Sequence, residues 1–445
     1  TFGDRPMFTA TMEKEKNALK TAALSAMATL CGGPISVTTE SKANLQFDIR
    51  RMLLWMDTMF TTESDRVHAI GRRALSNLVM HNKEYPYLLE HSISRCYMAE
   101  QPKALQSHFE VVTQILIDNP DYPIPFWRIL GIGLFTLGSE ISDIRSKSAA
   151  VLRTLEERQQ RNSKIQDFDI SISDKTKAVY KLAQFEISKR LASQHSEVAF
   201  LIFSEFTVYF KALKPMAQQN MVAAILPWIQ TIELQVDHLR DPTPQSYLIL
   251  ANLFEITIKS SSALHNEVQA LWQALATGPH PGNVKLVLDF IVQLCLDRRE
   301  QNFVEYSKQI VVFLSSTPAG IKVVDALIMN INCKDMIPHD RKKLSGQDDP
   351  AASPELAGMP YVADLSQALP VGQKQAAFSL GQLSLILLVD LMVSPVTLDG
   401  ERTDKVPLLL QAVIMLWDCH TPLVQDQARE MLIHLKPDQL QQRLK

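Results

Sequence analysis

The chain has 445 residues, of which 46% are hydrophobic and 21% are charged. This composition is too apolar for a disordered protein, and the length exceeds that of one compact domain, so we expect several domains or an elongated repeat. The 45 basic and 48 acidic side chains are mixed along the chain and give a net charge of −3. Because no basic face is evident, the sequence argues against nucleic-acid binding.

The cysteine content and the hydropathy of the chain indicate its cellular compartment. The five cysteines lie far apart without a Cys-x-x-Cys pair, which predicts a reduced, cytoplasmic protein without disulfides or structural zinc. The most apolar stretch, residues 378–393, is interrupted by Ser379, Gln382, Ser384 and Asp390. It is too short and too polar to span a bilayer, so we expect a buried helix and no membrane insertion. The first ten residues carry no signal-peptide pattern. The chain also lacks an initiator Met, which predicts a fragment of a longer protein, with processing of the N-terminus as the alternative.

Amphipathic helices are predicted almost without interruption. Glycine is scarce, at 15 of 445 residues, which disfavours hairpins and bulges. Apolar residues recur at helical spacing over 41–60, 64–80, 103–118 and 263–276. Ser41 and Ser64 stand where an N-cap belongs. The pattern predicts about eighteen helices and requires no strand.

Prolines and glycines mark the helix ends. Corners are predicted at 31–34, 119–123, 241–244 and 317–318. We place Pro244 and Pro318 at the first helical position, where the missing N–H is not needed. Short links between uniform helices predict an all-α fold, a right-handed α-solenoid of HEAT/armadillo-like helical pairs, with roughly nine or ten pairs.

Three segments favour HEAT-type pairs. They place Asp and Arg early, continue with small residues and close on leucines, and they span 64–78, 142–155 and 425–435. Each pair hides only part of its apolar surface, and stacking on its neighbours hides the rest.

Two breaks divide the predicted solenoid. Residues 159–173 are polar without a clean period, and residues 333–372 are rich in Pro, Ser, Asp and Gly. We interpret the first as a polar connection and the second as a flexible loop. Helical repeats are expected over 1–158, 174–332 and 373–445, as one continuous solenoid fragment.

The segment TGPHPGNVKLVLDFIV, residues 277–292, resembles a phosphate-binding loop that precedes a helix. Pro279 and Pro281 have no N–H to offer an anion, and the glycines do not match a phosphate-binding spacing. We therefore interpret the loop as a structural corner, with Asn283 as the N-cap of the next helix. His280 is a metal-ligand candidate by type, but without a second ligand nearby we favour a solvated turn histidine.

Two tryptophans stand out on apolar helical faces. In MVAAILPWIQTIEL, residues 221–234, the interior Pro227 removes a helix hydrogen bond and should bend or end the helix. Trp228 then wedges into the neighbouring pair, and we favour core packing over a partner site for its ring. Trp272 belongs to the apolar stripe of 263–276, and we assign it the same structural role.

Most of the common catalytic and cofactor-binding motifs are absent from the sequence. The sequence contains no HExxH, GxSxG or phosphate-binding GxxxxGK[ST]. The glycines of 131–138 have the wrong spacing for a dinucleotide fingerprint, and we expect them to allow close helix packing. Cys419 and His420 are adjacent, so their side chains diverge, and we place them at a helix end. The pair at 348–349, Asp-Asp, is a weak cation candidate, and we predict no cofactor and no metal.

The segment HDRKKLS, residues 339–345, carries a candidate phosphorylation site at Ser345. Three basic residues precede the serine, as in sites of basophilic kinases, and a phosphate would add a charge of about −2 beside them. We favour an ordinary solvated charge cluster here and keep Ser345 as the alternative.

Three stretches resemble the Furry family, whose fungal members are called cell morphogenesis proteins. They are AILPWIQTIEL at 224–234, ALWQALATGPHPGNVKLVLDFIV at 270–292 and QNFVEYSKQIVVFLSSTPAG at 301–320. The resemblance implies a fragment of a large, non-enzymatic HEAT/armadillo-like scaffold. It also implies partnership with an NDR/LATS-type kinase and its Mob coactivator at the cell cortex and sites of polarised growth. These kinases favour a His five residues before the target, whereas His339 lies six before Ser345.

Two other functions stay open from the sequence. One is a karyopherin-like or other transport solenoid, which the near-neutral charge and the lack of a long acidic loop disfavour. The other is an enzyme with an unfamiliar helical active site. The sequence leaves undetermined the oligomeric state and the surface that contacts the kinase or Mob.

Overall fold

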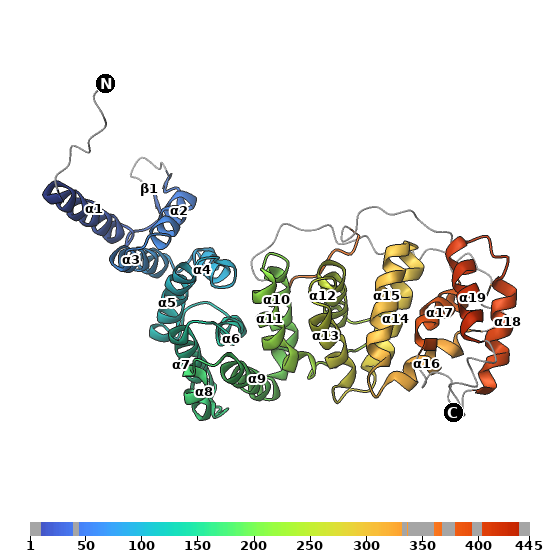
Figure 1. The fold of residues 1–445 in the computed structure, drawn as a ribbon. Helices are drawn as coiled ribbons and strands as arrows, with labels where there is room; N and C mark the ends of the chain where they lie inside the picture. Colours follow the sequence, from blue (N-terminus) through green and yellow to red (C-terminus); the bar gives the residue numbers. More distant parts are fainter. Residues whose placement is uncertain are drawn as a thin grey trace, which may run out of the picture. The chain divides into compact units, whose positions relative to one another are not determined.

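The computed structural model describes residues 10–38, 44–331, 336, 360–366, 379–393 and 403–435. In this part of the chain it contains nineteen α-helices and one two-stranded sheet (Figure 1). The helices group into two compact units, residues 1–187 and 188–445. Each helix packs mainly on helices close to it in sequence. The predicted all-α solenoid of stacked helical pairs is therefore confirmed.

The first unit contains two rows of helices. Its elements are α1 (Ala10–Leu30), β1 (Ser36–Thr38), β2 (Asn44–Gln46), α2 (Ile49–Phe60), α3 (Asp65–His81), α4 (Tyr87–Met98), α5 (Pro102–Asp118), α6 (Phe126–Thr136), α7 (Ser142–Arg158), the 3₁₀ turn η1 (Ile165–Phe168), α8 (Asp169–Ser173) and the start of α9 (Lys177–Gln194). Helices α3, α5 and α7 form one row, and α4 and α6 form the second. The pairs α4–α5 and α6–α7 join the rows, so the apolar core runs between them.

The second unit repeats this arrangement. After the end of α9 its elements are η2 (Ser196–Val198), α10 (Ala199–Phe210), α11 (Pro215–Ile229), α12 (Pro244–Ser260), α13 (His265–Thr277), α14 (Asn283–Arg298), α15 (Gln301–Ser315), α16 (Gly320–Met329), α17 (Leu380–Val389), η3 (Asp390–Val393), η4 (Thr403–Lys405), α18 (Val406–Leu416) and α19 (Pro422–His434). Helix α10 packs on α12, while α11, α13 and α15 pack in sequence as the other row.

Helix α17 is the apolar stretch that the sequence predicts as a buried helix. Every residue from Gly381 to Val389 is buried, and the helix packs against α14, α15, α16 and α19. The prediction is confirmed. Among the described helices, none combines the length and the apolar character that a membrane crossing requires.

Several predicted helix starts agree with the structure. Ser64 caps α3, because its side chain accepts the N–H of Val67 at 3.4 Å. Helices α5 and α12 begin at Pro102 and Pro244, and in both the proline's missing N–H lies where a helix leaves its amides unpaired.

The predicted helix start at Ser41 is wrong. Helix α2 begins at Ile49, and the Asp48 side chain caps it by accepting the N–H of Arg51 at 3.2 Å. Residues 44–46 instead pair with Ser36–Thr38 as an antiparallel ladder, so the expectation that no strand is needed also fails. An Asp N-cap suits the positive end of the helix dipole, which favours the later start. Ser41 itself lies outside the described residues.

The placement of Pro318 at a first helical position is also wrong. Helix α16 begins at Gly320, whose N–H donates to the carbonyl oxygen of Thr317 at 2.9 Å. Pro318 is therefore the second residue of a β-turn, where its fixed φ is equally suitable. A side chain at position 320 would place its Cβ 2.1 Å from the Ser315 carbonyl oxygen, so this close approach requires glycine.

Candidate interaction surfaces

Trp228 lies inside the second unit and is fully buried. Its Nε1 donates to Ser188 Oγ at 2.9 Å, and that hydroxyl donates to the Ala224 carbonyl oxygen at 2.5 Å. Pro227 occupies the last turn of α11, which ends at Ile229, so the interior proline ends the helix rather than bending it. The indole is thus a core anchor between α9 and α11.

Trp272 on α13 repeats this arrangement one helical pair later. Its Nε1 donates to Thr257 Oγ1 at 2.8 Å, and the hydroxyl donates to the Leu253 carbonyl oxygen at 2.8 Å. The ring is fully buried. A buried indole N–H needs an acceptor, and in both cases a hydroxyl on a neighbouring helix supplies it.

The glycine- and proline-containing loop 278–282 is a close-packed corner. A Cβ at Gly278 would lie 2.4 Å from the Gln230 carbonyl oxygen, so the loop backbone is pressed against the end of α11. Pro279 and Pro281 are exposed, and His280 Nδ1 lies 3.8 Å from Glu233 Oε2. These contacts hold two loops together and form no phosphate cradle.

Asn283 is not the N-cap that its position predicts. Gly282 is the N-cap residue, and Asn283 is the first residue of α14, with its side chain turned inward and buried. Its Oδ1 accepts the N–H of Leu234 at 2.9 Å, and its Nδ2 donates to the Ile232 carbonyl at 2.8 Å. The side chain therefore forms a clamp on residues 232–234 of the preceding corner. It supplies the hydrogen-bond partners that these buried backbone groups need away from water.

Asn82 in the first unit makes the same clamp. Its Oδ1 accepts the N–H of Ile35 at 3.0 Å, and its Nδ2 donates to the Gly33 carbonyl at 3.1 Å. In both clamps the asparagine grips the N–H of one residue and the carbonyl two residues earlier. The gripped loops lie 47 to 51 residues before the asparagines, about one helical repeat away.

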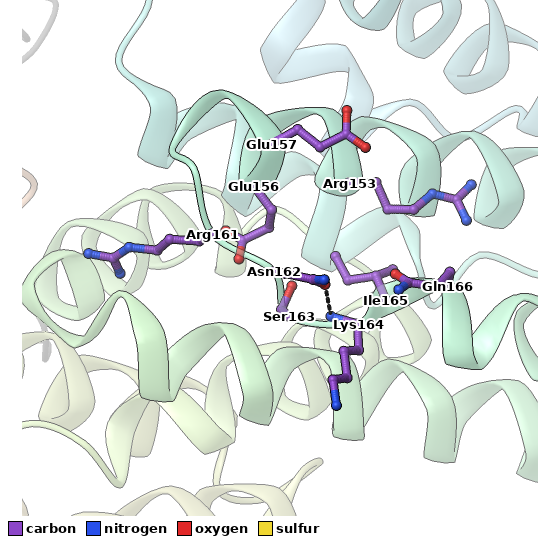
Figure 2. Close-up of a pocket in the computed structure, with 9 residues that line it drawn as sticks. All are labelled: Arg153, Glu156, Glu157, Arg161, Asn162, Ser163, Lys164, Ile165 and Gln166. Atoms are coloured by element: carbon purple, nitrogen blue, oxygen red, sulfur yellow. Dashed lines mark hydrogen bonds between the residues drawn. The ribbon is translucent and has the colours of Figure 1, made fainter.

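A polar hollow of about 320 Å³ lies between the end of α7 and the connection that follows (Figure 2). This polar hollow is lined by Arg153, Glu156, Glu157, Arg161, Asn162, Ser163, Lys164, Ile165 and Gln166. Both signs of charge are present, and only one lining residue is an apolar aliphatic. Such a lining resembles the polar rim of a protein interface more than an apolar small-molecule pocket.

The backbone of this connection is held in an unusual shape. Gln160 and Lys164 have φ values of 56° and 52°, in the left-handed region. Asn162 Oδ1 accepts the N–H of Lys164 at 2.9 Å, and Arg153 Nη1 lies 2.7 Å from Asp169 Oδ1 in α8. Non-glycine residues in this region cost roughly 1 kcal/mol each and concentrate at functional sites. The predicted polar connection 159–173 is therefore a candidate contact surface.

A cluster of titratable groups joins α2, α4 and α5. Asp57 Oδ2 lies 3.0 Å from His91 Nε2 and 3.2 Å from Arg95 Nη2, and Asp57 Oδ1 lies 2.9 Å from His108 Nε2. His108 Nδ1 lies 3.2 Å from Ser92 Oγ. Burial would raise the pKa of Asp57, but hydrogen bonds from the two histidines outweigh it and hold that pKa below its usual range. Burial lowers the pKa of His108, with partial opposition from Asp57.

By residue type this cluster would suit a divalent metal. One oxygen of Asp57 and one nitrogen each of His91 and His108 lie within 4.8 Å of one another. Arg95, however, already places a cation on the same carboxylate oxygen as His91, and a metal would have to share that oxygen with a like charge. The arrangement is satisfied as a hydrogen-bond network in which neutral His108 donates to ionised Asp57.

This network predicts a loss of stability in acid. His108 has a lowered folded pKa, so its stabilising effect is complete above about pH 6.5 and declines as pH falls through the folded value. Protonation of Asp57 also reduces the stability of the folded state, but only below about pH 3.9. We therefore expect the melting temperature to fall between about pH 8 and pH 5, and His108→Gln to reduce that fall while keeping a donor to Asp57.

Thermal unfolding at several pH values, followed by circular dichroism, measures this effect. His81→Gln is the matched control, because His81 is exposed on α3 of the same unit. An equal pH dependence in wild type and His108→Gln would show that His108 does not titrate with folding.

Two further candidate sites lie at a helix end and at a helix–helix contact. Cys419 and His420 follow the end of α18 at Leu416, so the predicted helix end is confirmed. Gly133 lies in α6, where an added Cβ would come within 2.7 Å of the Leu152 side chain on α7. This agrees with close helix packing. Ser345 and residues 348–349 lie outside the described part of the chain.

Sequence reasoning missed the Asp57 network and the asparagine clamps. The network joins residues 34 and 51 positions apart, which form no recognisable motif. The clamps had a usable signal, since Asn82 and Asn283 each lie at a helix boundary about one repeat after a corner. For Asn283, the N-cap interpretation explained that placement equally well.

Comparison with known proteins identifies the family. The model of the cell morphogenesis central region matches residues 61–339. Cell polarity protein mor2 of Schizosaccharomyces pombe is 27% identical over 435 residues, which cover 96% of this chain and 19% of that protein. Cell morphogenesis protein PAG1 of Saccharomyces cerevisiae is 26% identical over 431 residues, with coverage of 96% and 18%.

The chain therefore spans less than a fifth of the length of these two relatives. The matched region covers more than half of the chain and includes all three stretches that carry the resemblance, 224–234, 270–292 and 301–320. The chain belongs to the Furry family of cell morphogenesis proteins.

Proposed function

We propose that the chain is part of a non-enzymatic scaffold that binds and supports an NDR/LATS-type kinase with its Mob coactivator. The observation that carries this proposal is the collinear similarity, over 96% of the chain, to a cell polarity protein and a cell morphogenesis protein. The scaffold would serve polarised growth, cell morphogenesis and cell separation, and would act in the cytoplasm at the cell cortex and sites of growth.

The geometry supports a binding role. Stacked helical pairs give each unit long outer surfaces, while the buried tryptophans, clamp asparagines and Asp57 network hold helices and corners together. A scaffold built from such helical pairs can hold two partners at once and raise their local concentration without chemistry.

The polar hollow is the surface that we assign to this contact. Its mixed charges offer hydrogen bonds and ion pairs to a protein partner, and its backbone is fixed by Asn162 and the left-handed residues. Charges at such a rim act mainly on association rate and salt dependence.

Retention of the kinase and Mob tests the proposal. Tagged full-length protein and the 445-residue chain should each retain the NDR/LATS-type kinase and Mob from cell extract, and cross-linking followed by mass spectrometry should join a partner to residues 153–166. If neither the full-length protein nor the chain retains either partner, direct scaffolding is wrong.

A charge reversal tests the surface itself. Arg161→Glu should slow association with the kinase–Mob complex by roughly tenfold at low salt, and the effect should shrink as salt is added. The matched control is Lys20→Glu on the exposed face of α1. If both variants associate at the wild-type rate, the contact lies elsewhere, while retention still decides the scaffold proposal.

A further inference from the structure

Residues 360–366, here called the strap, lie against α10 and α12, although they follow α12 by about a hundred residues (Figure 1, the short orange trace beside α12). The strap backbone is held by side chains. Tyr361 N–H donates to Ser204 Oγ at 2.7 Å, and the Tyr361 carbonyl accepts from Asn252 Nδ2 at 3.0 Å. Ala363 N–H donates to Asn252 Oδ1 at 2.7 Å.

The strap side chains alternate like those of a β-strand. Ala363 and Leu365 are each 3% exposed, whereas Val362 is 40% exposed and Asp364 faces solvent. This period of two is that of an extended chain with one face against a surface. The helices therefore receive an extended peptide that presents every second residue to them.

The Tyr361 side chain makes two polar contacts at one end of this surface. The hydroxyl of Tyr361 donates to Glu255 Oε2 at 2.6 Å. The ammonium of Lys211 lies 5.7 Å from the centroid of the Tyr361 ring, within cation–π range. Lys259 also pairs with Glu255 and keeps its carboxylate in place.

Asn252 grips the strap with the same clamp that Asn82 and Asn283 use. It binds the N–H of one residue and the carbonyl two residues earlier, and it is fully buried beneath the strap. The other two asparagines grip corners within one repeat, whereas Asn252 grips a segment 109 to 111 residues later. It therefore holds a piece of chain that is remote in sequence from its own repeat.

We propose that Ser204 of α10 and Lys211, which follows that helix, form with Asn252 and Glu255 of α12 a binding groove for extended peptides, which the strap occupies in cis. The trans ligand is an extended segment of a partner protein with the pattern Tyr-x-Ala-x-Leu. It replaces the strap and makes the same contacts. This inference does not depend on the identity of the kinase or Mob.

Exchange is feasible because the groove recognises backbone groups that any extended peptide carries. In an empty groove, water takes the place of the two strap groups that the Asn252 amide binds. If the strap and a partner peptide make equal contacts, their occupancy of the groove differs mainly because the strap is tethered to the helices. The tether gives the strap an effective concentration in the millimolar range. A free peptide therefore binds tightly only when the strap is weakened.

Fluorescence anisotropy with a labelled peptide PYVADLS tests the groove in the full 445-residue chain. Tyr361→Ala combined with Ala363→Glu removes the ring and blocks the small-residue position, which frees the groove. This double variant should bind the peptide at least tenfold more tightly than the wild-type chain. Adding Asn252→Leu should reverse the gain.

Modified peptides keep the test independent of how the variants fold. N-methylation of the peptide nitrogens at the Tyr361 and Ala363 positions removes the donors to Ser204 and Asn252, so binding should fall at least tenfold. N-methylation at the outward Val362 position is the matched control and should change binding less. Equal binding by the wild-type and double-variant chains, no binding by the double variant, or indifference to the two inward N-methyl groups would each overturn the proposal.

Discussion

Trp228→Ala is expected to destabilise the second unit by about 3–5 kcal/mol. The substitution removes a fully buried indole and leaves a large cavity between α9 and α11. It also removes the donor to Ser188 Oγ. Urea unfolding followed by circular dichroism measures the change in the free energy of unfolding.

Two control variants separate these contributions. Trp228→Phe keeps most of the ring but loses the N–H, so we expect a loss of about 1–2 kcal/mol. Trp417→Ala removes a ring that is 40% exposed after α18 and should cost less than about 1 kcal/mol. A change below about 1 kcal/mol for Trp228→Ala would mean that the indole is exposed in solution, where a partner site becomes credible.

Arg145→Met is expected to destabilise the first unit by a similar amount, about 3–5 kcal/mol. Arg145 is 1% exposed, and its guanidinium lies 3.9 Å from the centroid of the Tyr180 ring. Its nitrogens donate to four backbone carbonyls on the two sides of α7, those of Ser139, Glu140, Ile172 and Asp174. Methionine fills the space but leaves these carbonyls without their donor.

Arg145→Lys tests whether the fork geometry matters. Lysine keeps the charge but cannot span both loops, so we expect an intermediate loss of about 2 kcal/mol. Arg158→Met removes a single exposed bond to the Ile117 carbonyl and should stay within about 0.5 kcal/mol of wild type. If Arg145→Met is as mild as Arg158→Met, the loops on the two sides of α7 are held by other contacts.

The helices were predictable because burial imposes a period on the apolar residues. The stripes of α3 and α5 and the proline at the start of α12 place these elements within one or two residues of the structure. Errors in the predicted helix bounds occur where two residues are similarly favourable as the helix start. Ser41 and Asp48 are both good N-caps, and the pairing of residues 44–46 with Ser36–Thr38 favours the later one.

The candidate sites were less predictable because they depend on contacts between distant residues. Residues 333–372 are rich in loop-forming residues, but this composition gives no indication that Asn252 would bind the backbone at Tyr361. Asp57, His91 and His108 likewise meet only because α2, α4 and α5 pack together. The polar connection at 159–173 was visible as a break in the periodicity, whereas its left-handed residues required coordinates.

The most direct test of the scaffold is the association of fluorescently labelled kinase and Mob, measured by energy transfer at concentrations below their own dissociation constant. Because one scaffold holds both partners, adding full-length protein should first raise the transfer and then lower it, when excess scaffold separates the partners onto different copies. This bell-shaped dependence is the predicted result. No change in transfer across the titration would contradict the scaffold account.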